Sequence, residues 1–422
     1  MEFYKKYDSG LKLVIKQMDG AFTVSSGIIV STGSRNESKD INGISHFIEH
    51  VNFKGTKTRT AFDISDETDR IGSTVNAFTS KECTCYYTKS IPEHQEETFA
   101  VLADLFLNST YPEDELDKER GVIIEEINMT EDTPDEVCMD LLSEAFYGDS
   151  GLGQTILGPE ENIRRFTVKD IKNYLEKYYT PDNVCISVAG ALDIKKTEEL
   201  VDKYFKDFKG FGTDSKIQVS AKKDEFDKNY TGNLCKKKDI EQAHIALSFP
   251  AYKYGDDRSA AANIACSVLG GAMSSRLFQT VREKQGLCYT VYSYLSQYRD
   301  TGKVEIYAGV NPKNREKALK SIIDVVNEFK NGITDAEFSR GKEQLKSAFI
   351  MSRESTSSEM QVYAKGWLLL DEKFDFEKKI NEINSVTKEE VESAIREIFD
   401  INKCAYATVG RNSEPLKVPE NK

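Results

Sequence analysis

Two histidines and a glutamate close together are the residues of this chain best suited to do chemistry. His46, Glu49 and His50 form the pattern His-x-x-Glu-His and include two of only four histidines in the chain. Residues four apart share one face of a helix, so both imidazoles can converge on one metal ion. Glu49 lies on nearly the same face, where a general base for a metal-held water belongs. The motif therefore suggests zinc-dependent hydrolysis.

The flanking sequence predicts that the motif lies on a short helix. Asn42 and Gly43 precede it and can cap a helix N-terminus. Gly55 follows it, at a point where a residue in the left-handed conformation often ends a helix. Between them, apolar residues recur at helical spacing: Ile44, Phe47, Ile48 and Val51. We expect a helix of about three turns, whose apolar stripe anchors the metal-binding face.

A catalytic zinc site needs a third protein ligand, and residues 112–130 are the best source. Pro112 suits the first turn of a helix, and acidic residues follow it at the positive end of the helix dipole. Glu119 and Glu126 are seven positions apart and share one face of this predicted helix. Glu125 points about 100° away. The sequence pattern alone does not choose between Glu125 and Glu126 as the ligand.

Further patterns predict both strands and helices. Residues 22–30 alternate as in a strand, and residues 75–88 indicate one strand or a hairpin. Helical spacing marks residues 102–107, 170–179 and 315–329. This order favours an α+β fold in which helices pack on one face of a mainly antiparallel sheet.

The sequence repeats itself with an offset of 220 residues. Thr167 and Thr387 each precede a predicted helix, and each has an acidic residue three positions later, which resembles a capping box. Both copies end in a predicted strand that stops at a glycine, Gly190 in the first and Gly410 in the second. The chain is therefore expected to contain two homologous halves.

The two halves are expected to form two domains. Residues 1–213 form the catalytic zinc-binding domain, residues 214–230 a polar linker, and residues 231–422 a homologous domain. The second domain lacks the motif, and its only histidine is His244. The duplicated fold has thus kept metal chemistry in one copy, and the other copy is free to bind substrate.

The composition disfavours several classes of protein. The net charge of −13 argues against binding to nucleic acid, which selects a basic surface. No stretch approaches the about 20 apolar residues that a membrane helix needs. The first residues lack the apolar segment of a secretory signal, so we expect a cytoplasmic protein with no membrane attachment. The eight scattered cysteines include no Cys-x-x-Cys pair, which favours free thiols in a reducing compartment.

Residues 31–89 resemble the catalytic half of the pitrilysin family, in particular its bacterial branch that is similar to the mitochondrial processing peptidase. Three segments carry the resemblance: Gly33–Glu37, the helix of the His-x-x-Glu-His motif with Phe53–Thr56, and Asn76–Glu82. The chain departs from the family pattern at Val51 and Asn52, where two apolar residues are usual. This departure concerns the shape of the pocket and not the metal.

The resemblance assigns roles to residues outside the motif. In that family the third ligand is the second glutamate of a segment like Glu119–Ile127, which implies Glu126. The upstream glutamate, which supports catalysis from beside the metal, corresponds to Glu119. An arginine and a tyrosine with the spacing of Arg282 and Tyr289 contact the substrate carbonyl and backbone in the family. Both can donate hydrogen bonds to an oxyanion.

The resemblance also implies how substrate is held. Phe53 is expected to line an apolar pocket beside the scissile bond. Asn76, Ala77 and Phe78 are expected to lie near the metal. An exposed strand edge at that place can add an extended peptide as a further strand.

The resemblance implies a zinc-dependent endopeptidase that hydrolyses extended oligopeptides, with one Zn2+ per chain and two chains in a homodimer. It also implies a fold of two like halves, each a mainly antiparallel sheet packed against helices. One alternative is a non-catalytic peptide-binding or scaffold subunit of a processing peptidase-like complex. Another is a zinc enzyme that acts on small molecules, although the length of the chain and its second half argue against it.

Overall fold

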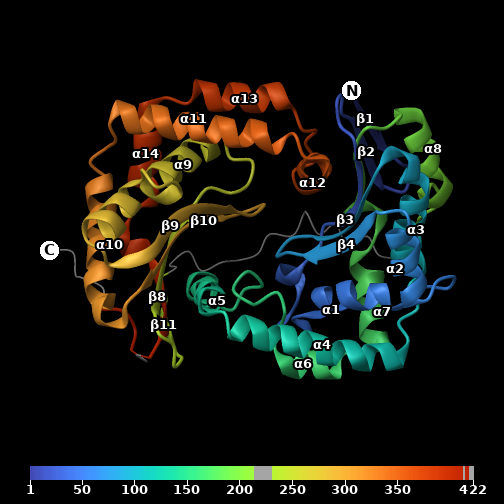
Figure 1. Ribbon diagram of the computed structural model, residues 1–422, viewed down its shortest axis with the longest axis horizontal. Coiled ribbons are helices and arrows are strands. Elements are labelled where there is room, and N and C mark those ends of the chain that lie inside the picture. The colour runs from blue at the N-terminus through green and yellow to red at the C-terminus, as the bar shows by residue number, and fades with distance from the viewer. Residues whose placement is uncertain (213–230, 412–413, 418–422) are drawn as a thin grey trace. The chain divides into compact units, whose positions relative to one another are not determined.

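The computed structural model describes residues 1–212, 231–411 and 414–417. The predicted linker at 214–230 lies outside these residues. The described chain forms two compact units, each built on one β-sheet with helices packed against it (Figure 1). This architecture confirms the predicted α+β class with two like halves.

Each compact unit includes a segment from the opposite half of the sequence. The first unit contains residues 1–127, 154–212 and 351–374. The second contains residues 128–153, 231–350 and the described residues from 375 onwards.

The sheet of the first unit has six strands in the order β1-β2-β6-β3-β5-β4. Strands β2 and β6 pair in parallel, and every other neighbouring pair is antiparallel. Strand β4 therefore lies at one edge of the sheet, and it forms a hairpin with β5. The strands are β1 (Glu2–Lys6), β2 (Lys12–Gln17), β3 (Val24–Val30), β4 (Thr74–Thr79), β5 (Thr84–Ser90) and β6 (Val184–Gly190).

The sheet of the second unit repeats this topology with five strands in the order β7-β11-β8-β10-β9. Strands β7 and β11 are parallel and the other pairs antiparallel, as in the series β2-β6-β3-β5-β4 of the first sheet. The strands are β7 (Asn233–Lys237), β8 (Ala243–Ala251), β9 (Cys288–Gln297), β10 (Gly302–Val310) and β11 (Ala405–Gly410).

The repeat read from the sequence also holds at single residues. Thr167 and Thr387 both form complete capping boxes, with Asp170 and Glu390 respectively. Strands β6 and β11 both end at the predicted glycines. The short sequence match around Thr167 and Thr387 therefore correctly predicted that the two halves share one sheet topology.

Six helices of each half follow the same order, whereas α2 and α8 of the first half have no α-helical counterpart among the described residues of the second. The first half provides α1 (Ile44–Val51), α2 (Ala61–Arg70), α3 (Gln95–Asn108), α4 (Glu113–Glu131), α5 (Pro134–Tyr147), α6 (Glu160–Arg165), α7 (Val168–Tyr178) and α8 (Ile194–Phe205). The second half provides α9 (Ser259–Cys266), α10 (Arg315–Phe329), α11 (Asp335–Ser352), α12 (Thr356–Leu369), α13 (Phe376–Ser385) and α14 (Lys388–Ile398).

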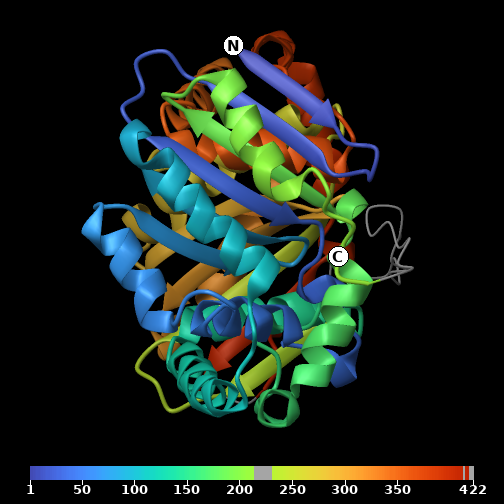
Figure 2. The same cartoon turned by 90° about the vertical axis from the view of Figure 1, so that its right-hand side faces the viewer.

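One helix from the second half of the sequence covers a face of the first sheet. Met360 and Tyr363 of α12 pack with Val14 and other buried residues of that face. The approach is closest at Gly27 of β3, where a Cβ atom would lie 2.3 Å from Sδ of Met360. Any residue larger than glycine at this position must therefore displace α12 or its methionine. Helices α3 and α8 cover the opposite face of the sheet (Figure 2).

The second sheet receives a helix from the first half in the same way. Cys138 and Leu142 of α5 pack against Ala246 and Ala407 of the sheet. We predicted helices on one face of each sheet, and that part of the prediction was wrong because both faces carry helices. The pattern of one half cannot reveal the second layer, since the helix that forms it comes from the other half.

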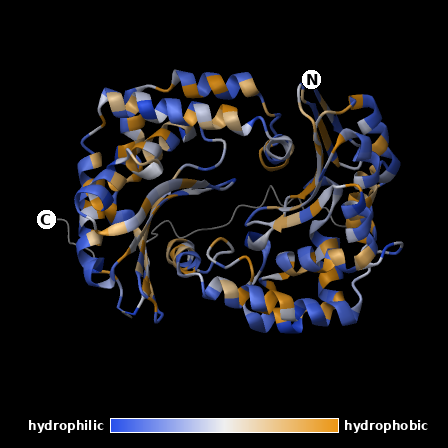
Figure 3. Cartoon of the chain, viewed as in Figure 1, coloured by the Kyte–Doolittle hydropathy of each residue, from blue (hydrophilic) through white to orange (hydrophobic). Residues whose placement is uncertain are grey.

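The helices carry hydrophilic and hydrophobic residues side by side, as expected when one face packs on a sheet (Figure 3). Among the described helices, none has the length and apolar character needed to cross a membrane. All eight cysteines are free thiols.

Candidate metal centre

Helix α1 begins at the predicted place but is capped by a residue that the sequence did not reveal. Its N-cap is Gly43, with φ of +98° and no side chain to offer. The carboxylate of buried Glu37 instead accepts hydrogen bonds from the backbone N–H groups of Gly43 (2.7 Å) and Ser45 (2.8 Å). Asn42, predicted as a cap, donates its amide to the same carboxylate at 2.9 Å. An anion at this end of a helix is favoured by the unpaired N–H groups and the helix dipole.

The C-terminal end of α1 is tighter than an α-helix. The α-helical part ends at Val51, and a 3-10 segment over Asn52–Lys54 continues it to Gly55. Asn52, the polar residue that departs from the family pattern, is buried, and its Oδ1 accepts a hydrogen bond from Tyr111 at 2.8 Å. Gly55 has φ of +128° and an extended ψ, so the segment ends at a glycine but not in the expected left-handed helical conformation.

Helix α4 confirms the predicted helix over residues 112–130 and presents its glutamates differently. Glu119 is buried, Glu126 is half-buried, and both lie on the face that contains buried Ile123. Glu125 is exposed to solvent on another face. The helical period therefore separates the two neighbouring glutamates that the sequence pattern left as alternatives.

The structure brings His46, His50 and Glu126 together. Oε2 of Glu126 lies 3.5 Å from Nε2 of His46 and 3.3 Å from Nε2 of His50. One ligand atom from each of the three lies within 4.8 Å of the others. Two ligands on a tetrahedral zinc ion are about 3.3 Å apart if each bond is about 2 Å long. Two imidazoles and one carboxylate at these spacings fit a zinc ion with one position left for water.

Glu49 lies beside this cluster and contacts the edge strand of the sheet. Its Oε2 accepts a hydrogen bond from the hydroxyl of Thr79, the last residue of β4, at 2.6 Å. Burial raises the pKa of Glu49, and the hydrogen bond from Thr79 only partly opposes this shift. A half-buried carboxyl with a raised pKa is suited to accept and return a proton near neutral pH.

A carboxylate and a lysine stand behind His50. Oε2 of Glu119 lies 3.2 Å from Nδ1 of His50, and its Oε1 lies 2.7 Å from Nζ of Lys54. Burial acts to raise the pKa of Glu119, but the hydrogen bonds with His50 and Lys54 outweigh it and hold that pKa below its usual value. His46 has no such support, because its buried Nδ1 has no hydrogen-bond partner in the described part of the chain.

The pKa values of the two histidines shift in opposite directions. Burial, followed by the neighbouring His50, lowers the pKa of His46 to about 4. Burial also acts to lower the pKa of His50, but hydrogen bonds with Glu119 and Glu126 outweigh it and raise that pKa to about 9. At neutral pH and without metal, His46 is therefore neutral and His50 is protonated.

The residues expected to hold substrate lie on or near the sheet edge. Asn76, Ala77 and Phe78 belong to β4, and Asn76 is exposed while the other two are half-buried. The N–H group of Ala77 bonds to the side chain of Asn76 at 2.8 Å and not to β5, so this peptide group faces away from the sheet. Phe53 is half-buried and packs with Val75 against a small apolar cluster.

Arg282 and Tyr289 lie close together in the second unit. Arg282 belongs to a π-helical segment, Phe278–Lys284, and Tyr289 is the second residue of β9. The guanidinium carbon of Arg282 lies 5.0 Å from the ring centre of Tyr289, a cation–π distance. The tyrosine is 76% exposed, so its hydroxyl is accessible.

Three residues of the site received no role from the sequence pattern: Glu37, Lys54 and Thr79. Local capping signals reach about three positions, whereas Glu37 precedes its helix by seven. Thr79 and Lys54 touch carboxylates that are distant in sequence. All three stand inside segments that carry the resemblance, which was the only available signal.

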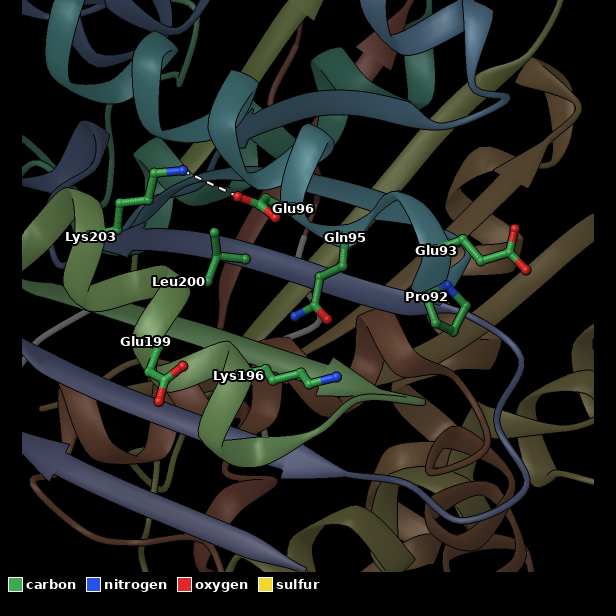
Figure 4. A pocket seen from close by; sticks show the side chains of 8 residues that line it. All are labelled: Pro92, Glu93, Gln95, Glu96, Lys196, Glu199, Leu200 and Lys203. Carbon is green, nitrogen blue, oxygen red and sulfur yellow. Dashed lines mark hydrogen bonds and ion pairs between the residues drawn. The ribbon is translucent and has the colours of Figure 1, made fainter.

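A surface cavity elsewhere in the first unit does not contribute to this site. It has a volume of about 460 Å³ and lies between α8 and the region where α3 begins (Figure 4). Lys203 and Glu96 form an ion pair of 3.2 Å across it. Its lining contains none of the candidate residues: Pro92, Glu93, Gln95, Glu96, Lys196, Glu199, Leu200 and Lys203.

Comparison with protein families gives two adjoining matches. The family described as "Insulinase (Peptidase family M16)" matches residues 12–160, which contain the cluster of His46, His50 and Glu126. The family described as "Peptidase M16 inactive domain" matches residues 165–345. The first match thus contains all three candidate metal ligands, and the second match contains none of them.

Two curated relatives match nearly the whole chain. The uncharacterized zinc protease YmxG of Bacillus subtilis is 43% identical over 398 residues, covering 94% of this chain and 95% of that protein. The uncharacterized zinc protease SCO5738 of Streptomyces coelicolor is 34% identical over 393 residues, covering 92% of this chain and 85% of that protein.

Two solved structures share the fold at low sequence identity. A protease from Helicobacter pylori has a TM-score of 0.89 and 24% identity, with 97% of this chain and 99% of that chain covered. A peptidase M16 inactive domain from Pseudomonas fluorescens has a TM-score of 0.87 and 18% identity, with 99% and 100% covered. These likenesses concern the fold alone.

Proposed function

The chain belongs to peptidase family M16, the pitrilysin family of zinc proteases, and on this premise we propose that it is a zinc-dependent endopeptidase that hydrolyses extended oligopeptides. The observation that carries the proposal is the convergence of His46, His50 and Glu126 with Glu49 beside them. A catalytic zinc site needs three such ligands and a neighbouring base.

His46, His50 and Glu126 are proposed to hold one zinc ion per chain. When bound there, zinc supplies Lewis acidity, which lowers the pKa of a water towards about 7 and polarises a peptide carbonyl. Glu119 orients the imidazole of His50 by accepting a hydrogen bond from its Nδ1, which leaves Nε2 for the metal.

Glu49 is proposed as the general base and then the general acid. It accepts a proton from the attacking water and delivers it to the amine that leaves the scissile bond. Thr79 donates its hydroxyl hydrogen to Oε2 of this carboxylate, which leaves Oε1 to receive the proton. The same bond ties the base to the end of β4.

Extended peptides are proposed to bind along the outer edge of β4. The peptide group of Ala77 faces away from β5, as a strand-pairing partner requires, and Thr79 on the same edge contacts the proposed base. A peptide added as a further strand exchanges main-chain hydrogen bonds with this edge. Such binding favours unfolded segments over folded proteins, whose backbones are already paired.

We extend the proposal to Arg282 and Tyr289 as donors to the oxyanion of the transition state. A guanidinium and a phenol both donate to a developing negative charge, and such donors contribute strongly to acyl transfer. Their mutual contact and the exposure of Tyr289 support the assignment. Removal of either group is expected to lower kcat more than it raises KM.

We also propose that two copies of the chain pair as a homodimer, as the family resemblance implies. Light scattering coupled to gel filtration measures this directly, because a monomer of 47.7 kDa and a dimer differ twofold in mass. A monomer that cleaves peptides at an undiminished rate would remove this part of the proposal.

A direct test uses an internally quenched fluorescent peptide and a chelator. The chain should cleave the peptide, lose activity when zinc is withdrawn and regain it when zinc returns. His50→Ala should lose both bound zinc and activity. Cleavage that persists in the chelator and in His50→Ala would contradict the proposal.

A second candidate function is a non-catalytic peptide-binding subunit. The observation in its favour is the match of residues 165–345 to a domain described as inactive. A chain of this kind would bind the quenched peptide without cleaving it, even with zinc supplied. The same assay, read as fluorescence anisotropy and as cleavage, separates the two candidates.

A further inference from the structure

We propose that Lys54 is a positioning residue of the metal centre, which holds Glu119 so that Glu119 can hold the imidazole of His50. This inference rests on the zinc site of the proposed function. It concerns a residue for which neither the motif nor the resemblance supplied a role.

The three side chains form a continuous chain of contacts. Nζ of Lys54 lies 2.7 Å from Oε1 of Glu119, and Oε2 of the same carboxylate lies 3.2 Å from Nδ1 of His50. Nε2 of His50 lies 3.3 Å from Glu126, the ligand on the same helix as Glu119. Each oxygen of the Glu119 carboxylate therefore has one assigned partner, and neither partner can move without disturbing the other.

The charges around the site give Lys54 a specific task. Glu49, Glu119 and Glu126 place three carboxyl groups near two imidazoles. Among the described residues, Lys54 is the only lysine or arginine within ion-pair distance of any of the three. The carboxylate it holds is only 6% exposed, so this ion pair is screened less by water than a surface pair.

The position of Lys54 in the chain makes the link short and stiff. It is the last residue of the 3-10 segment that continues α1, so it follows His50 by four positions. Its side chain crosses from that segment to Glu119 on α4. The ion pair thus fixes the two elements that carry the ligands to each other, at the point where their side chains must meet.

His50 depends on this link because, of the two proposed imidazole ligands, only His50 has a hydrogen-bond partner at Nδ1 among the described residues. The Nδ1 atom of His46 has no partner in the described part of the chain, so its orientation depends on packing alone. A hydrogen bond to Nδ1 selects the tautomer in which Nε2 is free to bind metal. Loss of the lysine should therefore appear first as weaker metal binding.

The test measures zinc affinity by competition with a chromophoric chelator. Lys54→Met keeps most of the side-chain length without the charge, and it should weaken zinc binding by about tenfold or more, as loss of such outer partners does. Lys54→Arg keeps a cation and should stay near wild type. Lys57→Met, at an exposed lysine on the same stretch, serves as the matched control and should change nothing.

A double variant separates positioning from a general effect of charge. Lys54→Met and Glu119→Gln break the same series of side-chain contacts. The double variant should therefore bind zinc only slightly more weakly than Glu119→Gln alone. Additive losses would overturn the proposal, and so would a folded Lys54→Met chain with wild-type zinc affinity. Lys54→Gln, checked by circular dichroism, replaces Lys54→Met if that variant unfolds. A wild-type chain that binds no zinc would sink the proposed function as well.

A separate observation concerns substrate preference, and we infer that Lys365 favours peptides with an acidic side chain beside Phe78. This inference rests on the proposed binding of peptides along β4. Side chains of β4 alternate between two faces: Ala77 packs in the cluster beneath α3, and Phe78 packs in the cluster beneath α12. A peptide paired with β4 alternates in the same way and presents every second side chain beside Phe78.

Lys365 supplies an uncompensated positive charge on that face. Its Nζ lies 5.8 Å from the ring centre of Phe78, and it has no carboxylate within ion-pair distance among the described residues. The nearby thiols of Cys83 and Cys85 are buried, and burial raises the pKa of each, so they stay neutral. An acidic substrate side chain would meet a free cation there, and a basic one would be repelled.

The test compares quenched peptides that differ only in Glu, Gln or Lys at each position around the scissile bond. At one position the wild type should favour Glu over Lys by about fivefold in kcat/KM, since half-exposed ion pairs are weak. Lys365→Glu should reverse that preference, and Lys365→Met should remove it. Lys373→Glu, an exposed lysine on the loop after α12, is the matched control for net charge.

The outcomes separate this inference from the proposed function. An unchanged preference in Lys365→Glu, or the same change in Lys373→Glu, overturns the role of Lys365 while the peptidase stands. If the wild type cleaves none of the peptides, the proposed function fails and this inference fails with it.

Discussion

Helices α1 and α9 occupy the same place in two copies of one topology, yet only α1 can bind a metal. His46, Glu49 and His50 are the third, sixth and seventh residues of α1. The same positions in α9 hold only apolar side chains, namely Ala261, Ile264 and Ala265, all buried. Both helices pack beside a sheet of the same strand order. The fold therefore requires a helix at this place but no charged residue on it.

Helices α4 and α11 show the same contrast. Glu119 is the seventh residue of α4, and the seventh residue of α11 is Gly341. A Cβ atom on Gly341 would lie 3.0 Å from Val268 and 3.2 Å from Ile264, so the second copy closes over the space with apolar contacts. Buried ionisable groups cost stability unless they are fully paired. At these helix positions, only the first copy carries such groups, which supports the chemical role proposed for them.

The largest effect is expected when α1 receives the residues of α9. The triple variant His46→Ala, Glu49→Ile, His50→Ala should bind no zinc and show no cleavage above background. It should keep its secondary structure, because α9 folds with these residues. Metal analysis, the peptide assay and circular dichroism test the three statements. An unfolded triple variant would show that the charged cluster is part of the fold.

Glu49→Gln should separate chemistry from metal binding. The amide keeps the shape of the side chain but accepts no proton, so kcat should fall by about 10²- to 10⁴-fold. Zinc content should stay at the wild-type level, because Glu49 is not among the proposed ligands. A variant that loses its zinc would instead place Glu49 in the coordination sphere.

The reverse exchange should damage the second copy. Gly341→Glu places a carboxylate in an apolar contact without a partner, and it should lower the free energy of unfolding by about 3 kcal/mol. Denaturant titration measures this value. Gly121→Glu is the control: Gly121 is exposed on α4, and a Cβ atom added there would meet nothing within 4 Å. A better helix former at Gly121 should be neutral or slightly stabilising, so equal effects at both glycines would refute the comparison.

The pH dependence of zinc binding should report one histidine and not two. The pKa of His50 is raised to about 9, so below that pH a proton occupies it and competes with zinc. The pKa of His46 is lowered to about 4, so it is already neutral. Affinity should therefore rise about tenfold from pH 5.5 to pH 6.5. A hundredfold rise would mean that both imidazoles bind protons.

The sequence predicted the parts of this site that depend on local periodicity. Spacing on one helix places His46, Glu49 and His50 together, and spacing on another places Glu119 with Glu126. The choice of Glu126 over Glu125 needed the resemblance, since the helical period alone does not show which face meets α1. A periodic pattern predicts which residues share a face within one helix or strand. It does not predict which faces of two elements pack against each other.

The unpredicted features all involve partners distant in sequence. Glu37 caps α1 from outside the range of capping motifs, and Lys54 reaches a carboxylate on α4. The second helical layer of each sheet comes from the opposite half of the chain. Such long-range partners leave no pattern in the local sequence. The capping boxes at Thr167 and Thr387 join residues only three positions apart, so the sequence predicted them.

The exchange of α5 and α12 constrains how this protein can evolve. If the gene lost its second half, Val14, Ile29 and their neighbours on the first sheet would lie bare to water, and aggregation would follow. A gene shortened in this way would leave the first sheet without one of its two helical layers, although α9 and α11 carry no counterpart of the candidate ligands. The second half therefore has a structural role that does not depend on binding a metal, because its helix α12 shields one face of the first sheet from water.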